Sequence, residues 1–329
     1  MKTYLEKLYH YQSLSYDEAF GAMNLLSQGQ VHQSQMASFI TAYLMRPIST
    51  EELRGFTDAL LDLAITVRFD RHVMDVCGTG GDGKNTFNIS TLTALVLAGC
   101  GISVAKHGNY GVSSISGSSD VLQYLGYRFT QDTDLLQKQL DTCNICFLHA
   151  PLFHPALRHV AQVRKELGTR TFFNMLGPLI NPARPEHRLI GVFHAELGRN
   201  YHYLLQQAGA SYLVVHSTDG YDEMSCTADT KLFSHRGETL LTMSAFGMRT
   251  LNPHEITGGA SISDAASIFT RVLQGKGSEA QHQVVIANTA IALQNIYPLS
   301  NEDAIAMATD SLLGGNAYRL FKTLLTLNP

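Results

Sequence analysis

The sequence predicts an α/β fold, with a small all-helical N-terminal domain and a larger domain that has a mostly parallel central sheet flanked by helices. Three observations predict it. The first part of the chain shows only helical spacing of apolar residues, the middle alternates short apolar runs with helical stretches, and the end is helical again. Alternating strand and helix signals are typical of a parallel sheet covered by helices. The 329 residues leave room for both domains.

Residues 1–68 carry the signals of the small helical domain. Ser15 with Glu18, and Ser49 with Glu52, match the capping box that begins a helix, and apolar residues follow each pair at helical spacing. The second pair precedes an apolar stripe made of Leu53, Phe56, Leu60 and Leu63. Such a stripe packs inside its domain or against a second subunit.

The larger domain, residues 69–329, begins where the pattern changes. Strands are expected near residues 72–77, 102–106, 145–149, 188–194 and 211–216. Helical spacing occupies residues 91–98, 132–140, 155–167 and 197–208 between them, and residues 278–297 and 302–327 are expected to form long helices. Residues 154–185 are expected to be a helical connection that packs near the small domain.

Composition and charge exclude several classes of protein. The net charge of −4 argues against a broad nucleic-acid-binding face. No apolar run reaches the roughly 20 residues of a membrane span. The first residues lack the continuous apolar region of a secretory signal, so a cytoplasmic protein is expected. The five cysteines suit free thiols, since Cys143 and Cys146 form a CxxC with no second pair or His couplet to complete a zinc site.

The segment GTGGDGKNTFNIST, Gly78 to Thr91, is the most informative part of the chain. Gly78, Gly80 and Gly83 satisfy the GxGxxG pattern directly after an expected strand. A dinucleotide site also requires an acidic residue about 20 positions later. Residues 84–119 contain no Asp or Glu, which argues against that interpretation.

The same region offers many hydrogen-bond donors and two lysines, which suits a polyanion. Glycines let backbone N–H groups approach phosphate oxygens, and a helix that begins near Ser90 would add its positive end. A plain tight turn before a buried helix would explain one glycine cluster. It hardly explains a second donor-rich loop after the next strand, at residues 106–118.

Two further features point to ligands. Asp222 and Glu223 follow the strand that ends near residue 216, which places them at the carboxyl end of the sheet, where Mg²⁺ could be shared with a phosphate group. A polar surface turn is the alternative. Arg164 lies on the apolar face of its expected helix and needs an anion. An internal ion pair or a side chain that reaches solvent is the alternative there.

Four blocks together resemble the anthranilate phosphoribosyltransferase family of tryptophan biosynthesis. They are GTGGDGKNTFNIST, KHGN with SSISGSSDVL, HPALRHVAQVRKELGTRTFFNMLGPLINP, and DGYDEMS, in the family's order and spacing over roughly residues 70–225. The resemblance implies an enzyme that transfers a phosphoribosyl group from 5-phosphoribosyl 1-pyrophosphate to the amine of anthranilate. It also implies Mg²⁺ as cofactor and a homodimer formed through the helical domain.

The resemblance assigns roles to single residues. The phosphoribosyl pyrophosphate contacts would be Gly78, Gly81, Asp82, Thr86, Asn88, Ile89, Ser90, Thr91, Lys106, His107, Gly108, Asn109, Tyr110, Gly111, Val112, Ser113, Ser114 and Ser118. Lys106 would stabilise the leaving group, and His107 is a weak candidate for a general base. Gly78, Asn109 and Arg164 would line the anthranilate site. The metal ligands would be Ser90, Asp222 and Glu223.

One position departs from the family pattern. Where many members have Arg after KHGN, this chain has Tyr110 followed by Gly111, and we hypothesise that the Tyr110 ring stacks on the aromatic substrate. Two alternatives stay open for the whole protein: an enzyme like the pyrimidine nucleoside phosphorylases, and a non-catalytic relative that binds nucleic acid. The intact NIST run and the paired carboxylates favour a pyrophosphate donor with metal.

Overall fold

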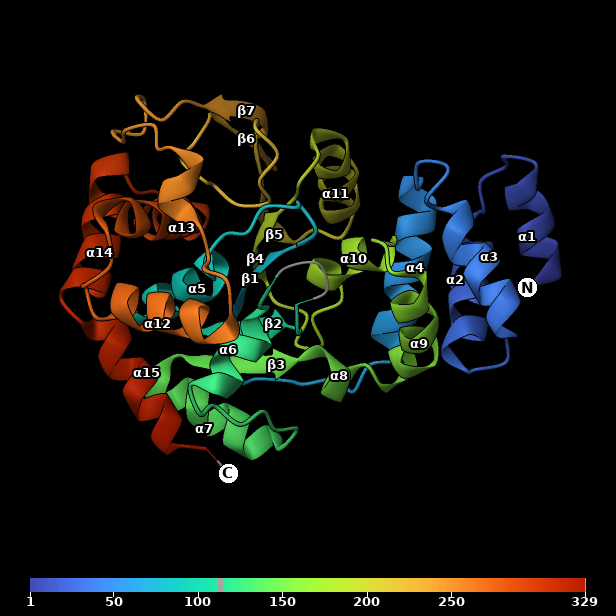
Figure 1. Ribbon diagram of the computed structural model, residues 1–329, viewed down its shortest axis with the longest axis horizontal. Helices are drawn as coiled ribbons and strands as arrows, with labels where there is room; N and C mark the ends of the chain where they lie inside the picture. The colour runs from blue at the N-terminus through green and yellow to red at the C-terminus, as the bar shows by residue number, and fades with distance from the viewer. Residues whose placement is uncertain (112–114, 329) are drawn as a thin grey trace.

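The computed structural model describes residues 1–111 and 115–328 and begins with four helices at one side of the molecule (Figure 1). They are α1 (Lys2–Tyr9), α2 (Tyr16–Ser27), α3 (Gln33–Ala42) and α4 (Thr50–Asp62). Both expected capping boxes are present, at the starts of α2 and α4. Glu52 does more than cap, because its buried carboxylate also pairs with Arg46 and accepts from the Leu14 N–H at 2.9 Å.

A seven-stranded sheet forms the centre of the second part, in the order β3-β2-β1-β4-β5-β6-β7. The first five strands are β1 (Met74–Gly78), β2 (Val104–Gly108), β3 (Ile145–His149), β4 (His187–Gly191) and β5 (Ser211–Ser217). These pair in parallel, as expected from the sequence. The fold class is therefore confirmed.

The helices of the second part cover both faces of this sheet. They are α5 (Ile89–Gly99), α6 (Ser118–Tyr124), α7 (Thr133–Cys143), α11 (Ala195–Gln207), α12 (Ile262–Leu273), α13 (Glu279–Ile296), α14 (Asn301–Leu313) and α15 (Asn316–Thr326). One face packs on α5, α12 and α13, and α14 and α15 extend this layer outwards. The other face packs on α7 at the β2–β3 side and on α11 at the β4–β5 side. Cys143 and Cys146 face different core clusters.

Short helices connect β3 to β4 and join the two parts. They are α8 (Ala150–Phe153), η1 (Pro155–Leu157), α9 (Arg158–Leu167), α10 (Phe173–Leu176) and η2 (Gly177–Leu179). Helix α9 contacts α2 and α3, and Figure 1 shows α9 and α10 lying next to the four N-terminal helices. Buried residues of α2 to α4, α9, α10, β4 and α11 form one apolar cluster. The helical part therefore shares its core with one face of the sheet.

The structure differs from the sequence expectations in two details, one an omission and one an error. Strands β6 (Thr230–Ser234) and β7 (Gly237–Leu241) form an antiparallel hairpin at the sheet edge that the sequence reasoning did not predict. Its strands are short and β7 is largely exposed, so they carry little of the apolar signal that marks a buried strand. The helix expected over 302–327 is broken into α14 and α15, because Gly315 adopts a φ of +78°. Among the described residues, no helix has the length and apolar character needed to cross a membrane.

Candidate active site

The pocket lies at the carboxyl ends of the central strands. From β1 the sheet extends through β2 to β3 on one side and through β4 to β5 on the other, so the chain changes direction here. In open α/β sheets ligands bind at such a switch point. The loops after β1, β2 and β5 meet there with α9 and α10. The described lining comprises Leu60, Cys77, Gly78, Thr79, Gly80, Gly81, Asp82, Gly83, Lys84, Thr86, Phe87, Asn88, Ser90, Thr91, Lys106, His107, Gly108, Asn109, Tyr110, Gly111, Ser116, Gly117, Ser118, Ala150, Leu157, Arg164, Phe173, Asn174, Leu176, Gly177, Ile180, Asp222 and Glu223.

The glycines that end β1 and β4 allow the loop after β5 to pass close to the sheet. A Cβ on Gly78 would strike the Asp222 carboxylate, and a Cβ on Gly191 would strike the Asp222 backbone carbonyl. The sequence had indicated only a close approach of phosphate to this region. Helix α5 begins at Ile89, well after the end of β1 at Gly78, so the GxGxxG glycines do not open a helix as a dinucleotide fold requires.

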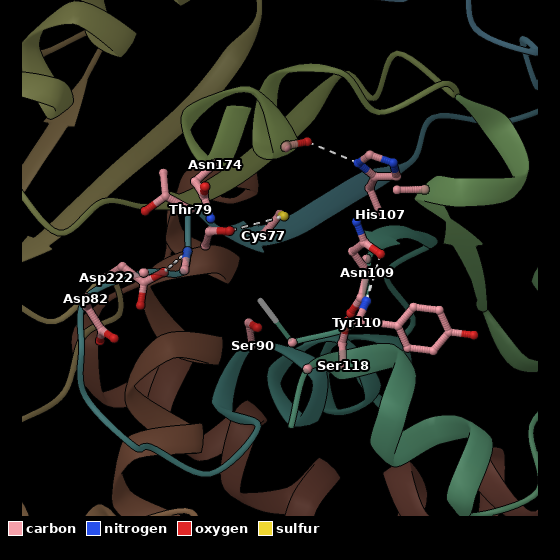
Figure 2. Close-up of a pocket in the computed structure, with 18 of the residues that line it drawn as sticks. Cys77, Thr79, Asp82, Ser90, His107, Asn109, Tyr110, Ser118, Asn174 and Asp222 are labelled. Atoms are coloured by element: carbon pink, nitrogen blue, oxygen red, sulfur yellow. Dashed lines mark hydrogen bonds between the residues drawn. The ribbon is translucent and has the colours of Figure 1, made fainter. Parts of the chain in front are cut away.

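Acidic side chains gather on one wall of the pocket (Figure 2). Asp222 Oδ2 accepts from the Gly80 N–H at 2.6 Å, and Glu223 Oε1 accepts from the Ser90 N–H at 2.9 Å. Burial, followed by repulsion from Asp82, raises the pKa of Asp222 to about 7. Burial and repulsion from Asp222 also raise the pKa of Glu223. Without a bound cation, the protein therefore disfavours the charged forms of these two carboxyl groups.

This acidic wall fits a magnesium ion that is shared with a substrate. Carboxylates and the Ser90 hydroxyl are hard oxygen donors of the kind Mg²⁺ prefers. Within residues 1–111 and 115–328, no three His, Cys, Asp or Glu side chains are grouped closely enough to hold a metal by themselves. Mg²⁺ commonly binds through one or two carboxylates together with phosphate oxygens and water. The donors therefore fit an ion that needs phosphate to complete its coordination.

The start of α5 leaves polar groups without partners beside this wall. Its N-cap residue Asn88 makes no side-chain cap bond. Buried oxygens of Thr79, Asn88 and Thr91 have no hydrogen-bond partner among the described residues. Buried polar atoms are normally paired, and the N-terminus of a helix attracts anions. A ligand rich in negatively charged oxygens would suit this part of the pocket.

Lys106 and His107 lie at the end of β2, with their side chains on different partners. The Lys106 ammonium donates to the Val76 carbonyl and lies 3.5 Å from Ser90 Oγ, so this buried cation sits under the start of α5. His107 Nδ1 lies 3.0 Å from the Gly177 carbonyl, which can only accept, so Nδ1 carries the proton. His107 Nε2 has no partner among the described residues, and burial lowers the pKa of this imidazole to about 4.

A positive charge without a counter-ion occupies a different wall. The Arg164 guanidinium of α9 lies 5.1 Å from the Phe173 ring centre. Burial lowers its pKa, and no carboxylate among the described residues pairs with it. The apolar side chains of Leu157 and Leu176 line the same pocket. This wall suits a ligand that combines an apolar surface with a negative group.

Comparison with known proteins decides the family. Residues 70–318 match the model of the glycosyl transferase family a/b domain, and residues 2–64 match its helical bundle domain. An anthranilate phosphoribosyltransferase of Christiangramia forsetii is 49% identical over 100% of this chain and 99% of its own. One from Flavobacterium johnsoniae is 47% identical over 100% of both chains. The chain belongs to the anthranilate phosphoribosyltransferase family.

Solved structures of anthranilate phosphoribosyltransferases have the same fold. The Thermus thermophilus enzyme is 33% identical over 98% of both chains, with a TM-score of 0.90. The Saccharomyces cerevisiae enzyme in complex with PRPP and Mg is 28% identical, with a TM-score of 0.91, over 99% of this chain and 96% of that one. The yeast enzyme in complex with 4-fluoroanthranilate has a TM-score of 0.87 at 27% identity over the same shares.

In this member of the anthranilate phosphoribosyltransferase family, most of the residues expected from the sequence line one pocket. Ile89, the first residue of α5, is the exception, because its side chain is fully buried in the core. Val112, Ser113 and Ser114 lie outside the described residues. The others that line the pocket are Gly78, Gly81, Asp82, Thr86, Asn88, Ser90, Thr91, Lys106, His107, Gly108, Asn109, Tyr110, Gly111, Ser118, Arg164, Asp222 and Glu223.

Sequence reasoning on this anthranilate phosphoribosyltransferase family member missed the wall made by α10 and η2. Phe173, Asn174 and Gly177 line the pocket there, and Leu60 reaches it from α4. The signal was present, since FFNMLGP belongs to one of the blocks that carry the resemblance. No charged side chain in this run marks it as part of a site.

Proposed function

We propose that this protein transfers the phosphoribosyl group of 5-phosphoribosyl 1-pyrophosphate (PRPP) to the amine of anthranilate, a step of tryptophan biosynthesis. Pyrophosphate and N-(5-phosphoribosyl)anthranilate are the products. The observation that carries the proposal is that one pocket holds the unpaired Arg164 on an apolar wall and the Asp222–Glu223 pair beside the open start of α5. The first wall suits an aromatic carboxylate, and the second suits a metal-bound pyrophosphate.

The two substrates are assigned to these two walls. Arg164, with Gly78 and Asn109, would bind anthranilate, and the guanidinium would gain the carboxylate that it lacks. The loops after β1 and β2 would bind PRPP through backbone N–H groups and hydroxyls. The yeast relatives bound to PRPP with Mg and to 4-fluoroanthranilate support a pocket of this kind. Ile89 would contribute only its backbone, at the first residue of α5.

Ser90, Asp222 and Glu223 would hold the Mg²⁺. When bound, this ion would neutralise charge on the pyrophosphate as it leaves. The chain's own contribution is to present carboxyl groups whose charged forms are disfavoured, by burial and then by repulsion, unless a cation is bound, and to keep Lys106 next to Ser90. The ammonium of Lys106 and the N–H groups at the start of α5 would add positive potential on the same side.

In the reaction, the bond between ribose C1 and the pyrophosphate oxygen breaks as the amine of anthranilate attacks from the opposite face. Carbon C1 is inverted, and no protein nucleophile is needed. The ribose passes through an oxocarbenium-like state, as in glycoside cleavage. The protein would act mainly by holding both substrates in line, because correct orientation removes a large part of such a barrier.

His107 would accept a hydrogen bond from the amine. Because its Nδ1 proton points to the Gly177 carbonyl, Nε2 carries the free lone pair. Its pKa, lowered by burial to about 4, makes it a weak base. An aromatic amine attacks as neutral NH₂ and loses its proton late, so a weak acceptor is sufficient.

The deciding experiment mixes the protein with Mg²⁺, PRPP and anthranilate and follows the loss of anthranilate fluorescence together with the release of pyrophosphate. We expect both signals to appear in equal amounts and to require Mg²⁺. A matched reaction replaces PRPP with ribose 5-phosphate, which keeps the 5-phosphate but has no pyrophosphate to release. Unchanged fluorescence without any pyrophosphate release would rule out the proposed reaction.

The protein is also proposed to form a homodimer through its helical domain. Tyr11 is 74% and Met45 is 71% exposed beside a groove between α1 and α3 that is lined in part by Leu8 and Ala37. Exposed apolar side chains grouped in this way favour burial against another chain. Light scattering should give twice the chain mass of 36.1 kDa, and a particle of single-chain mass would refute the dimer.

The cytoplasmic location stays a prediction. The five cysteines agree with it, because all are free thiols in the structure, as is usual in a reducing compartment. Fractionation of the source cells would test it, and recovery of the protein from an oxidising compartment would contradict it.

A further inference from the structure

Tyr110 has its backbone in the pocket and its ring outside. The residue belongs to the lining, between Asn109 and Gly111. In Figure 2, however, its ring extends away from Ser90 and Asp222. The ring centre lies 4.7 Å from that of His149, with an interplanar angle of 80°, and the hydroxyl donates to Gln123 Oε1 of α6 at 3.3 Å. The ring therefore contacts the protein rather than the space where a substrate would bind.

His149 is a fixed support for this ring. It ends β3, where it pairs with Gly108 of β2, and its Nδ1 lies 2.9 Å from Ser119 Oγ. The Phe129 ring stacks on it at 4.6 Å with an angle of 22°. Burial lowers the pKa of His149 to about 4, so the ring is neutral at neutral pH. A column of Tyr110, His149 and Phe129 thus connects the loop after β2 to the body of the domain.

The backbone on both sides of Tyr110 is also constrained. Asp120 Oδ2 accepts from the N–H groups of Gly111 and Gly117 at 2.8 Å each. The Asn109 carbonyl accepts from the Ser119 N–H at 3.2 Å, and Asn109 Oδ1 accepts from the Tyr110 N–H at 2.8 Å. A Cβ on Gly117 would strike this backbone, so the two limbs of the loop are in direct contact. The Tyr110 side chain joins this loop to both β3 and α6.

We propose that Tyr110 is a positioning residue, whose ring contact with His149 holds the Asn109–Gly111 backbone in the geometry that binds PRPP. The proposal rests on the proposed function and replaces the hypothesis that the ring stacks on anthranilate. An edge-to-face aromatic pair contributes about 1 kcal/mol, and every 1.4 kcal/mol corresponds to a tenfold change in binding. Loss of the pair should thus weaken PRPP binding about fivefold.

The test compares Tyr110→Leu, Tyr110→Phe and the control Tyr124→Leu. Tyr124 is another exposed tyrosine, on α6, whose hydroxyl contacts Ser263 away from the pocket. Tyr110→Leu should raise the KM for PRPP about fivefold while the KM for anthranilate and the melting temperature stay unchanged. Tyr110→Phe keeps the ring on His149 and should restore most of the affinity. Tyr124→Leu should match the unmodified protein.

Several results would overturn the proposal. An effect of Tyr110→Leu confined to the KM for anthranilate would indicate substrate stacking instead, and equal PRPP affinity in all variants would exclude any role for the ring. Loss of affinity in Tyr110→Phe as large as in Tyr110→Leu would assign the effect to the hydroxyl. Calorimetric titration with PRPP and Mg²⁺ measures PRPP binding without requiring the reaction. An unmodified protein that binds PRPP without turnover would therefore refute only the proposed function, and not the role of Tyr110. If Tyr110→Leu lowers the melting temperature, a second variant, Gln123→Leu, removes only the partner of the Tyr110 hydroxyl. Gln123→Leu should leave PRPP affinity almost unchanged. A fivefold loss of PRPP affinity in Gln123→Leu would refute the ring contact as the cause.

Discussion

Replacing Asp222 by Asn, or Glu223 by Gln, is expected to lower kcat/KM by about 100- to 1000-fold, the usual cost of losing one preorganised electrostatic contact to a transition state. Both changes keep the size of the side chain and remove one negative charge from the acidic wall. The Mg²⁺ concentration needed for half-maximal rate should rise, because each carboxylate is a proposed ligand. Steady-state rates over a series of Mg²⁺ concentrations give both quantities.

The same two substitutions, Asp222→Asn and Glu223→Gln, should leave the stability of the protein without Mg²⁺ unchanged or raise it. Burial, followed by repulsion within the Asp82, Asp222 and Glu223 group, raises the pKa of Asp222 and of Glu223, so their charged forms are disfavoured when no cation is bound. Removing one charge relieves this repulsion, and the melting temperature without Mg²⁺ should be equal or higher. Asp219→Asn is the matched control, since Asp219 lies in the same turn but bonds Ser217 and Thr227 outside the pocket. Unchanged Mg²⁺ dependence in both Asp222→Asn and Glu223→Gln would remove them as ligands.

The parts of the fold that were predicted from the sequence are those with local signals. Capping boxes at Ser15 and Ser49 depend on residues three positions apart, and both are present. The first five strands are apolar runs bounded by polar residues, and all five occur. The β6–β7 hairpin has little apolar content to reveal it. Residues 154–185 were expected to pack near the small domain, but how α9 and α10 lie between the helical part and the sheet is a tertiary feature that no local pattern encodes.

In the candidate site, too, some features could be predicted from the sequence and others could not. That the loops after β1, β2 and β5 meet could be predicted, because parallel strands bring their carboxyl ends to one edge of a sheet. The direction in which a side chain points could not be predicted. Tyr110 lies in the loop after β2, and Ile89 lies where the loop after β1 ends. The Tyr110 ring packs on His149, however, and the Ile89 side chain is in the core. The close approach of Asp222 to Gly191 brings the loop after β5 against the end of β4, a contact between residues far apart in the sequence.

Replacing Arg164 by Ala is expected to raise the KM for anthranilate by at least about 30-fold, because truncating one partner of a buried, hydrogen-bonded charge pair costs about 2 kcal/mol or more. Anthranilate would supply the carboxylate that this guanidinium lacks. The KM for PRPP should change little, since the proposed donor contacts lie on the loops after β1 and β2. Lys165→Ala is the control, because Lys165 is on the same helix but exposed to solvent.

The free energy of unfolding distinguishes a ligand-binding arginine from a structural one. A structural arginine in an internal ion pair would leave a buried charge unpaired when removed, and the protein would be destabilised. Arg164 has no such partner among the described residues, and only its contact with the Phe173 ring would be lost. Arg164→Ala should therefore unfold at the same urea concentration as the unmodified protein, or a higher one.

Arg164→Lys keeps the charge without the planar fork and should recover only part of the affinity. An increase confined to the KM for PRPP, or a clear loss of stability, would mean that the guanidinium serves the donor site or the fold rather than anthranilate.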